Sequence, residues 1–311
     1  MKILEIILPV LVMIVLGMIC RKKKLLNQNG INNMKMLVTN IMLPVAIFHA
    51  LATAKYSKET GILVGIMFVM LLVSFGTGFL LRPVMEEQYR RYLPYMVCVY
   101  EGGMMAYPLY TSLCGSENLS QIAVLDIAGL LFGFSLYMGM LGQTERGEPF
   151  DGKKLLRNAF KTPAFIASVL GIIAGVSGVI RILLEGPFGN VYLSVENILT
   201  TSITALILLV VGYSMELTPG LLKPCMKTIL IRMGIQTVMA AGVLMAVHWL
   251  IGNSMLLNAA VIIYMSAPAT FSLQTFLKRQ ESSAYVSTVN SLYCIVSVCT
   301  YIVTAMIIYG W

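Results

Sequence analysis

The sequence has little charge and few of the residues that build catalytic and metal sites. Charged residues make up 12% of the chain, about half the share in an ordinary soluble domain, and only two histidines are present. Hydrophobic residues make up 58% of the 311 positions. This balance excludes an ordinary soluble protein and predicts an all-α polytopic membrane protein.

Several signatures of soluble enzymes are also absent. There is no G-x-x-x-x-G-K-[ST] loop for ATP, no G-x-S-x-G nucleophile elbow and no H-E-x-x-H metal pair. We therefore expect no enzymatic activity, no cofactor and no metal. The six cysteines form no C-x-x-C pair and are interpreted as small apolar side chains in helices. They are Cys20, Cys98, Cys114, Cys225, Cys294 and Cys299.

What the chain has instead is a series of apolar runs of membrane-spanning length. The first is interpreted as a retained helix, because the basic cluster Arg21 to Lys24 follows it and no signal-peptide cleavage site is present. An even number of spans places both termini on one side. The ten predicted spans are 3–20, 34–53, 60–81, 92–114, 120–142, 158–178, 191–214, 226–251, 255–277 and 284–309.

Positive charge is concentrated at one end of these spans. Lys2, Lys55, Lys58 and Arg181 lie at one end, and the other eighteen of the 22 Lys and Arg lie at the opposite end. Because basic loops stay in the cytoplasm, we expect the odd-numbered connections to be cytoplasmic and both termini to be non-cytoplasmic, in the plasma (inner) membrane. This placement explains the net charge of +8 without a nucleic-acid partner.

A polar connection at the midpoint divides the chain into two halves. Residues 1–142 form a first five-helix repeat, 143–157 a cytoplasmic connecting loop and 158–311 a second repeat, which is inverted because five is odd. Leu8–Gly17 and Thr162–Gly171 open the two halves with proline and Val-Leu-Gly at the same spacing. The fourth span of each half has an internal proline, Pro108 and Pro268, and such matched interruptions mark the binding site of secondary transporters.

The stretch Tyr100–Tyr110 is the most unusual of these spans, because it holds Glu101 beside a glycine pair and a proline. A carboxylate inside a membrane span is costly and indicates function. Burial disfavours its ionised form, so Glu101 is predicted to couple transport to protons. Two alternatives are a role as ligand for Na⁺ or another cation, and a permanent pairing with a neighbour.

Motifs in both halves resemble the auxin efflux carrier family, which includes plant auxin exporters and bacterial carriers proposed for malonate and other organic acids. The matching segments are Gly17 with its basic cluster, Thr39–Phe48, Thr162–Ile172, Gly212–Met215, Pro268 with Phe276–Arg279, and Tyr285–Thr288. The resemblance implies two inverted five-helix repeats whose broken fourth and ninth helices cross near the midplane, as in bile-acid and sodium/proton transporters. It also implies transport of carboxylates without ATP, and its plant members suggest a homodimer.

One residue departs from the family pattern. Glu101 stands where the family commonly has Asn, and a charged carboxylate there would repel an anion. We expect half-helix N-termini at the crossing, and the amide of Asn40, to favour a carboxylate. The predicted substrate-binding residues are Asn40, Pro44, Glu101, Gly102, Gly103, Pro108, Pro268, Thr270, Ser272 and Gln274.

Other polar residues in the spans have weaker signals. Thr200, Thr201, Ser202 and Thr204 are expected to face the same cavity. Asp126 is expected near the outer interface, and Asn290 is expected to brace the ninth helix.

The sequence thus predicts a secondary active carrier, exporting by family resemblance, that moves small organic anions by alternating access. Its partners would be the anion and membrane lipids. Two alternatives remain: a sodium- or cation-coupled carrier with Glu101 as ligand, and a non-transporting membrane sensor with the same fold.

Overall fold

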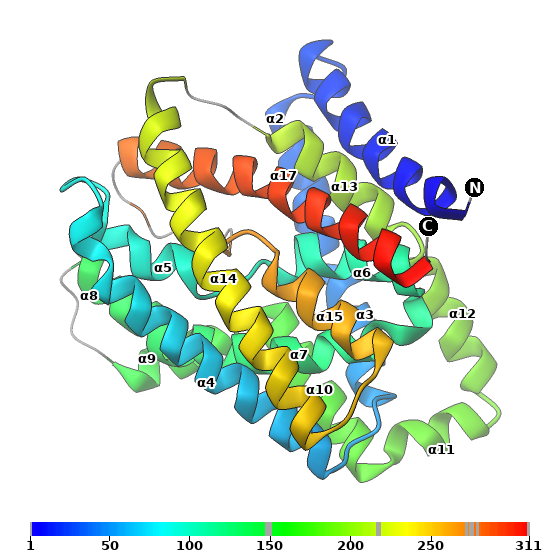
Figure 1. Ribbon diagram of the computed structural model, residues 1–311. Helices are drawn as coiled ribbons and strands as arrows, with labels where there is room; N and C mark the ends of the chain where they lie inside the picture. Colours follow the sequence, from blue (N-terminus) through cyan, green and yellow to red (C-terminus); the bar gives the residue numbers. More distant parts are fainter. Residues whose placement is uncertain are drawn as a thin grey trace.

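The computed structural model describes residues 2–146, 151–215, 219–270, 273, 277 and 280–309, and regular structure in these residues is helical (Figure 1). Seven helices there are long and apolar enough to cross a membrane. The pair α9 (Gly152–Ala159) and α10 (Pro163–Ser177), bent by 81°, brings the number to eight if it is one span. Two of the ten predicted spans, the fourth and the ninth, are interrupted.

The first half runs from the N-terminus to the end of α8. Both α8 and α9 extend into residues 143–157, which the sequence predicted to be a loop. The elements of the first half are α1 (Lys2–Lys22), α2 (Gln28–Leu37), η1 (Val38–Met42), α3 (Leu43–Ala52), α4 (Lys58–Leu80), η2 (Arg82–Val84), η3 (Arg90–Tyr92), α5 (Leu93–Val97), η4 (Gly102–Ala106), α6 (Tyr107–Cys114), η5 (Ser116–Asn118), α7 (Leu119–Phe132), η6 (Gly133–Tyr137) and α8 (Met138–Arg146).

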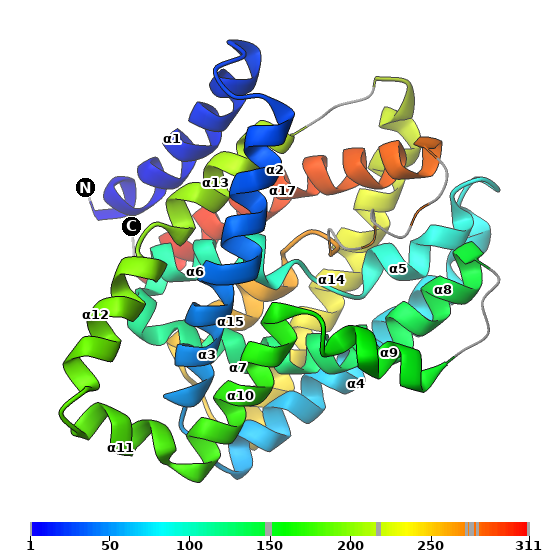
Figure 2. The same cartoon turned by 180° about the vertical axis from the view of Figure 1, so that it is seen from behind.

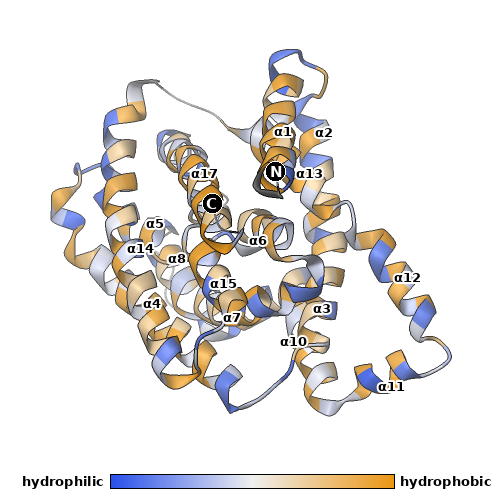
Figure 3. Cartoon of the chain, turned by 45° about the vertical axis from the view of Figure 1, so that its right-hand side comes forward, coloured by the Kyte–Doolittle hydropathy of each residue, from blue (hydrophilic) through white to orange (hydrophobic). Residues whose placement is uncertain are grey.

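The second half begins with α9 and α10. It continues with α11 (Val179–Glu185), α12 (Gly189–Thr200), α13 (Ile203–Ser214), η7 (Pro219–Leu221), α14 (Leu222–Leu250), α15 (Met255–Met265) and α17 (Gln280–Tyr309). The N- and C-termini lie near each other (Figures 1 and 3).

Helices begin where the sequence supplies caps. The Asn27 side chain accepts a hydrogen bond from the Gly30 amide at the start of α2, at 2.7 Å. Asp151 and Ser254 cap α9 and α15 in the same way. Such side chains satisfy amides that have no partner within the first turn of a helix.

The two most extensive helix–helix contacts, α1 with α13 and α10 with α3, depend on glycine. On α1, a Cβ at Gly17 would lie 2.2 Å from the Leu209 carbonyl oxygen of α13. On α10, a Cβ at Gly171 would lie 2.9 Å from the Phe48 carbonyl oxygen of α3. Small residues let backbones approach closely in membrane proteins, so α1 packs on α13 and α10 on α3 (Figure 2).

Many large hydrophobic side chains on these helices are exposed, as expected for contact with lipid, and hydrophobic positions predominate along the helices in Figure 3. Polar residues gather at the helix ends. We call the end with the α1–α2 turn, the residues between α4 and α5, and α9 the basic end; it is the end that the charge count places in the cytoplasm. The opposite end carries the α3–α4 turn, α11 and the α14–α15 turn (Figures 1 and 2).

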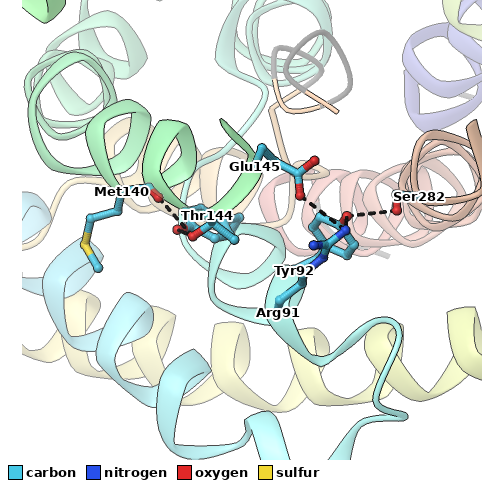
Figure 4. A network of polar contacts seen from close by, with 7 residues as sticks. Arg91, Tyr92, Met140, Thr144, Glu145 and Ser282 are labelled. Carbon is cyan, nitrogen blue, oxygen red and sulfur yellow. Dashed lines mark hydrogen bonds and ion pairs between the residues drawn. The ribbon is translucent and has the colours of Figure 1, made fainter. Parts of the chain in front are cut away.

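A polar network ties the two halves together at the basic end (Figure 4). The Arg91 guanidinium lies 3.5 Å from a carboxylate oxygen of Glu145 on α8. The Tyr92 hydroxyl donates to the Ser282 hydroxyl of α17 at 2.8 Å. The start of the interrupted fourth segment is therefore anchored to both α8 and α17.

Candidate functional site

The two interrupted segments meet in the middle of the molecule. Tyr100 and Ala269 form an isolated antiparallel bridge. The Glu101 amide donates to the Pro268 carbonyl oxygen at 2.9 Å, and the Thr270 amide donates to the Val99 carbonyl oxygen at 3.2 Å. Each break thus supplies hydrogen-bond partners that the other break has lost from its helix, which is how non-helical backbone is accommodated inside a membrane.

The fourth segment breaks before its proline. Residues 98–101 are non-helical, whereas Pro108 lies in the first turn of α6, so the interruption lies several residues before the proline at which the sequence places it. Proline lacks an amide hydrogen and is tolerated near a helix start. The preceding turn is π-helical, with the Tyr107 amide bonded to the Gly102 carbonyl oxygen. The break itself is at Glu101 and the residues before it.

A buried arginine holds the ends of both half-helices. Arg232 of α14 has no exposed surface, and its guanidinium donates to the Met96 carbonyl oxygen and, at 2.7 Å, to that of Ala267. These carbonyls lie at the C-terminal ends of α5 and α15, where the helix dipole is negative. The count of basic residues treats Arg232 as a loop charge. That assignment is wrong, because the guanidinium is buried and its hydrogen bonds go to backbone carbonyls.

On the other side of the crossing lies a carboxylate. Asp126 of α7 accepts hydrogen bonds from the Tyr107 hydroxyl at 2.8 Å and from the Tyr264 hydroxyl at 2.6 Å. A Cβ at Gly102 would lie 2.7 Å from the Asp126 carboxylate, so glycine is needed for this approach. Asp126 therefore links α6 to α15 beside the start of η4, and the expectation that it faces the outer interface is wrong.

Glu101 lies in the break, at the start of the second half-helix. Its side chain is partly buried, and its carbonyl oxygen accepts from the Ala106 amide at 3.1 Å. Its amide donates to the Pro268 carbonyl oxygen, so Glu101 lies directly at the crossing of the two segments.

Two cavities approach the crossing from opposite ends. The first, of about 370 Å³, lies toward the basic end between α2, α13 and α17, and Met104 of η4 lines it. The second, of about 530 Å³, lies toward the opposite end between α3, α6, α12 and α13, and Tyr107 and Pro108 line it. Met104 lines the first cavity and Tyr107 lines the second, so only the residues between them separate the two cavities along this part of the chain.

The predicted site residues are only partly brought together. Glu101, Gly102, Gly103, Pro268 and Thr270 lie at the crossing, and Pro108 lines the second cavity. Asn40 is exposed in η1, and both it and Pro44 of α3 line neither cavity. Ser272 and Gln274 lie outside the described residues. Of the polar residues near the start of α13, Thr200, Thr201 and Thr204 line the second cavity.

Residue patterns could have pointed to α17. Ser287, Asn290 and Ser291 are polar residues three and four positions apart in an apolar span, and all three line the first cavity. Asn290 was expected to brace the ninth helix, yet neither of its amide atoms has a hydrogen-bond partner among the described residues. Among the described residues, therefore, Asn290 makes no side-chain hydrogen bond that would brace the ninth helix.

The family described as membrane transport protein matches residues 2–151. The match covers just under half of the chain and agrees with the resemblance to the auxin efflux carrier family. The matched residues include the Thr39–Phe48 motif and the whole interrupted fourth segment. A comparison with curated proteins finds no match.

Proposed function

We propose that the protein is a secondary active carrier of small organic anions, working by alternating access between its two cavities. The observation that supports this best is the crossing of two interrupted segments, with a cavity at each end. A carrier needs a site that can open to either side, and broken helices at a repeat interface supply one. The membrane transport domain in residues 2–151 points to the same activity.

We further propose that the two interrupted segments are the fourth and ninth of ten spans in two inverted repeats. In an inverted repeat, the contact of helix one with helix seven is equivalent to that of helix six with helix two. α1 packs on α13 through Gly17, and α10 packs on α3 through Gly171. Gly17 and Gly171 are also the residues that align when the two halves are compared by sequence.

Glu101 is the group that we propose couples transport to protons. A carboxyl in the break can release its proton when the cavity on one side is hydrated and regain it on the other. A neutral Glu101 would also remove the repulsion of an anionic ligand. Placement in the plasma membrane, with the basic end in the cytoplasm, completes the proposal.

Flux through liposomes containing the purified protein tests the proposal. A panel of radiolabelled monocarboxylates and dicarboxylates should include at least one whose uptake is saturable, independent of ATP and dependent on a pH gradient. Glu101→Gln should abolish the dependence on the gradient, whereas Glu59→Gln, an exposed residue at the start of α4, should leave it unchanged.

Three results would contradict the proposal in different ways. Full pH dependence in Glu101→Gln would remove Glu101 from coupling. A requirement for Na⁺ in place of the proton gradient would favour the cation-coupled alternative. Binding of carboxylates without flux of any of them would favour a sensor.

A further inference from the structure

A short charged helix joins the two halves of the chain at the basic end. α9 has three basic residues among its eight, whereas α10 contains no charged residue. The two helices are bent by 81° at the turn between them (Figure 2). Membrane-spanning helices tilt by about 20° from the bilayer normal on average, so α10 as a spanning segment leaves α9 close to the plane of the membrane. α9 therefore lies at the depth where α10 enters the bilayer.

Packing on the protein fixes which side of α9 faces outward. Ala159 is buried and Leu155 is partly buried, and the helix contacts η6 of the first half. Phe160, directly after the helix, packs edge-on against Phe165 of α10, with 5.3 Å between the ring centroids. The Phe165 ring in turn packs edge-on against that of Phe134 in η6, at 5.2 Å. The side of α9 opposite these contacts is therefore free to meet its surroundings.

The outward side carries a basic row next to an apolar row. Lys153, Arg157 and Lys161 are exposed and four positions apart, so their side chains lie along one side of the helix and its last turn. Leu156 is 57% exposed and Phe160 is 50% exposed, also four positions apart. An amphipathic helix with this division, lying parallel to the membrane, is typical of a segment bound in the headgroup region.

The charge and depth of this surface identify what covers it. Asp151 is the one carboxylate among the described residues of the segment 151–161, and its side chain caps the first turn by accepting from the Lys153 and Lys154 amides. The basic row therefore matches a layer of negative charge, and the apolar row matches the acyl chains directly beneath it. A soluble acidic partner would match the basic row alone.

We propose that α9 and its last turn bind anionic phospholipids of the leaflet at the basic end. The lipid phosphates contact Lys153, Arg157 and Lys161, and the Leu156 and Phe160 side chains enter the upper part of the acyl chains. This contact holds the connection between the two halves at the membrane surface. It depends neither on the proposed carrier function nor on any transported substrate.

Hydrogen–deuterium exchange of the purified full chain in lipid nanodiscs tests the proposal. Nanodiscs of phosphatidylcholine alone are compared with nanodiscs that also contain phosphatidylglycerol. The amides of residues 153–161 should exchange about fivefold or more slowly in the second, since each basic residue near an anionic surface contributes about a factor of five in affinity. High salt should remove the difference, because it screens the charges. Equal exchange in the two lipids would overturn the proposal.

Neutralising the basic row tests which charges are responsible. The variant that combines Lys153→Gln, Arg157→Gln and Lys161→Gln should exchange at the same rate in both lipids. A matched control removes three exposed charges from the opposite end: Lys55→Gln, Lys58→Gln and Arg181→Gln. The control should keep the full difference between lipids. If it loses the difference as the first variant does, net charge and not α9 binds the lipid, and the proposal is wrong.

The apolar row has its own test. Leu156→Gln should speed exchange of α9 in both lipids, because the side chain no longer enters the acyl chains. Asn158→Gln, an exposed residue on the same helix, should not. Unchanged exchange in α14 shows that each variant is folded. If Leu156→Gln and Asn158→Gln behave alike, α9 rests on the protein only and does not enter the membrane.

Discussion

Arg232 combines hydrogen bonds to backbone carbonyls with contacts to two tyrosine rings. Its guanidinium satisfies carbonyls at the ends of two half-helices, and it lies 4.7 Å from the centre of the Tyr293 ring and 5.4 Å from that of Tyr100. Gln236, one turn later on α14, donates to the Val97 carbonyl oxygen at 2.8 Å. One face of α14 therefore supports the break in the fourth segment, and Arg232 also holds the break in the ninth.

Replacement of this arginine tests that support. Arg232→Met leaves two buried carbonyls without donors, each costing about 1–3 kcal/mol, so the variant should unfold several degrees lower and lose transport. Arg232→Lys keeps the charge but loses the geometry that lets one guanidinium reach two carbonyls. Its unfolding temperature and transport rate should therefore lie between those of Arg232→Met and the unsubstituted protein. Thermal unfolding of the purified protein, followed by flux in liposomes, measures both effects.

A matched control is available on the same helix. Lys227 of α14 is exposed, and Lys227→Met removes the same charge without touching the crossing. It should unfold at the same temperature as the unsubstituted protein. If Arg232→Met behaves like Lys227→Met, the guanidinium does not hold the two breaks.

At the scale of elements, the α1–α13 contact depends on Gly212 as well as Gly17. A Cβ at Gly212 would lie 2.0 Å from the Ile14 carbonyl oxygen, whereas one at Gly234 on α14 meets nothing within 4 Å. Gly212→Ala should therefore force α1 away from α13 and lower the melting temperature. Gly234→Ala should raise it, because alanine favours a helix by about 1 kcal/mol over glycine. Equal shifts of the same sign would show that α1 and α13 do not depend on this contact.

The elements also show what the sequence could and could not predict. Long apolar runs predicted most helices, and the proline and glycine near Glu101 predicted an interrupted fourth segment. Arg232 follows Lys223 and Lys227 in the chain, so the sequence suggests that it is another loop charge. Its carbonyl partners are far away in the sequence, and the residues around Arg232 therefore give no sign that it is buried. The same holds for Asp126, whose tyrosine partners come from α6 and α15.

The positions within single helices were harder still. The sequence of a helix includes residues from every face, and only the packing of the helix determines which face lines a cavity. Asn40 and Asn290 are both amides in apolar segments, yet Asn40 is exposed and Asn290 is buried at the cavity. Family resemblance favoured the first, and only the packing of α2, α13 and α17 reveals the second.

At the scale of the whole molecule, the two cavities differ in charge. The cavity at the basic end is lined by Lys35 and by no carboxylate among the described residues. The cavity at the opposite end is lined by Glu117 and Glu196. A carboxylate ligand is therefore attracted at the basic end and repelled at the other, so its affinity should be higher on the side of the basic end.

This asymmetry predicts a side-specific effect of removing one carboxylate. Glu196→Gln should lower the KM for a transported carboxylate by about threefold or more at the opposite end, as expected for one partly screened charge pair, and leave the KM at the basic end unchanged. Vesicles with a single orientation of the protein, assayed with ligand added to one side at a time, measure the two KM values. Glu185→Gln, on exposed α11 outside the cavity, should change neither value. Equal KM changes on both sides would show that the second cavity does not act as a separate, acidic exit.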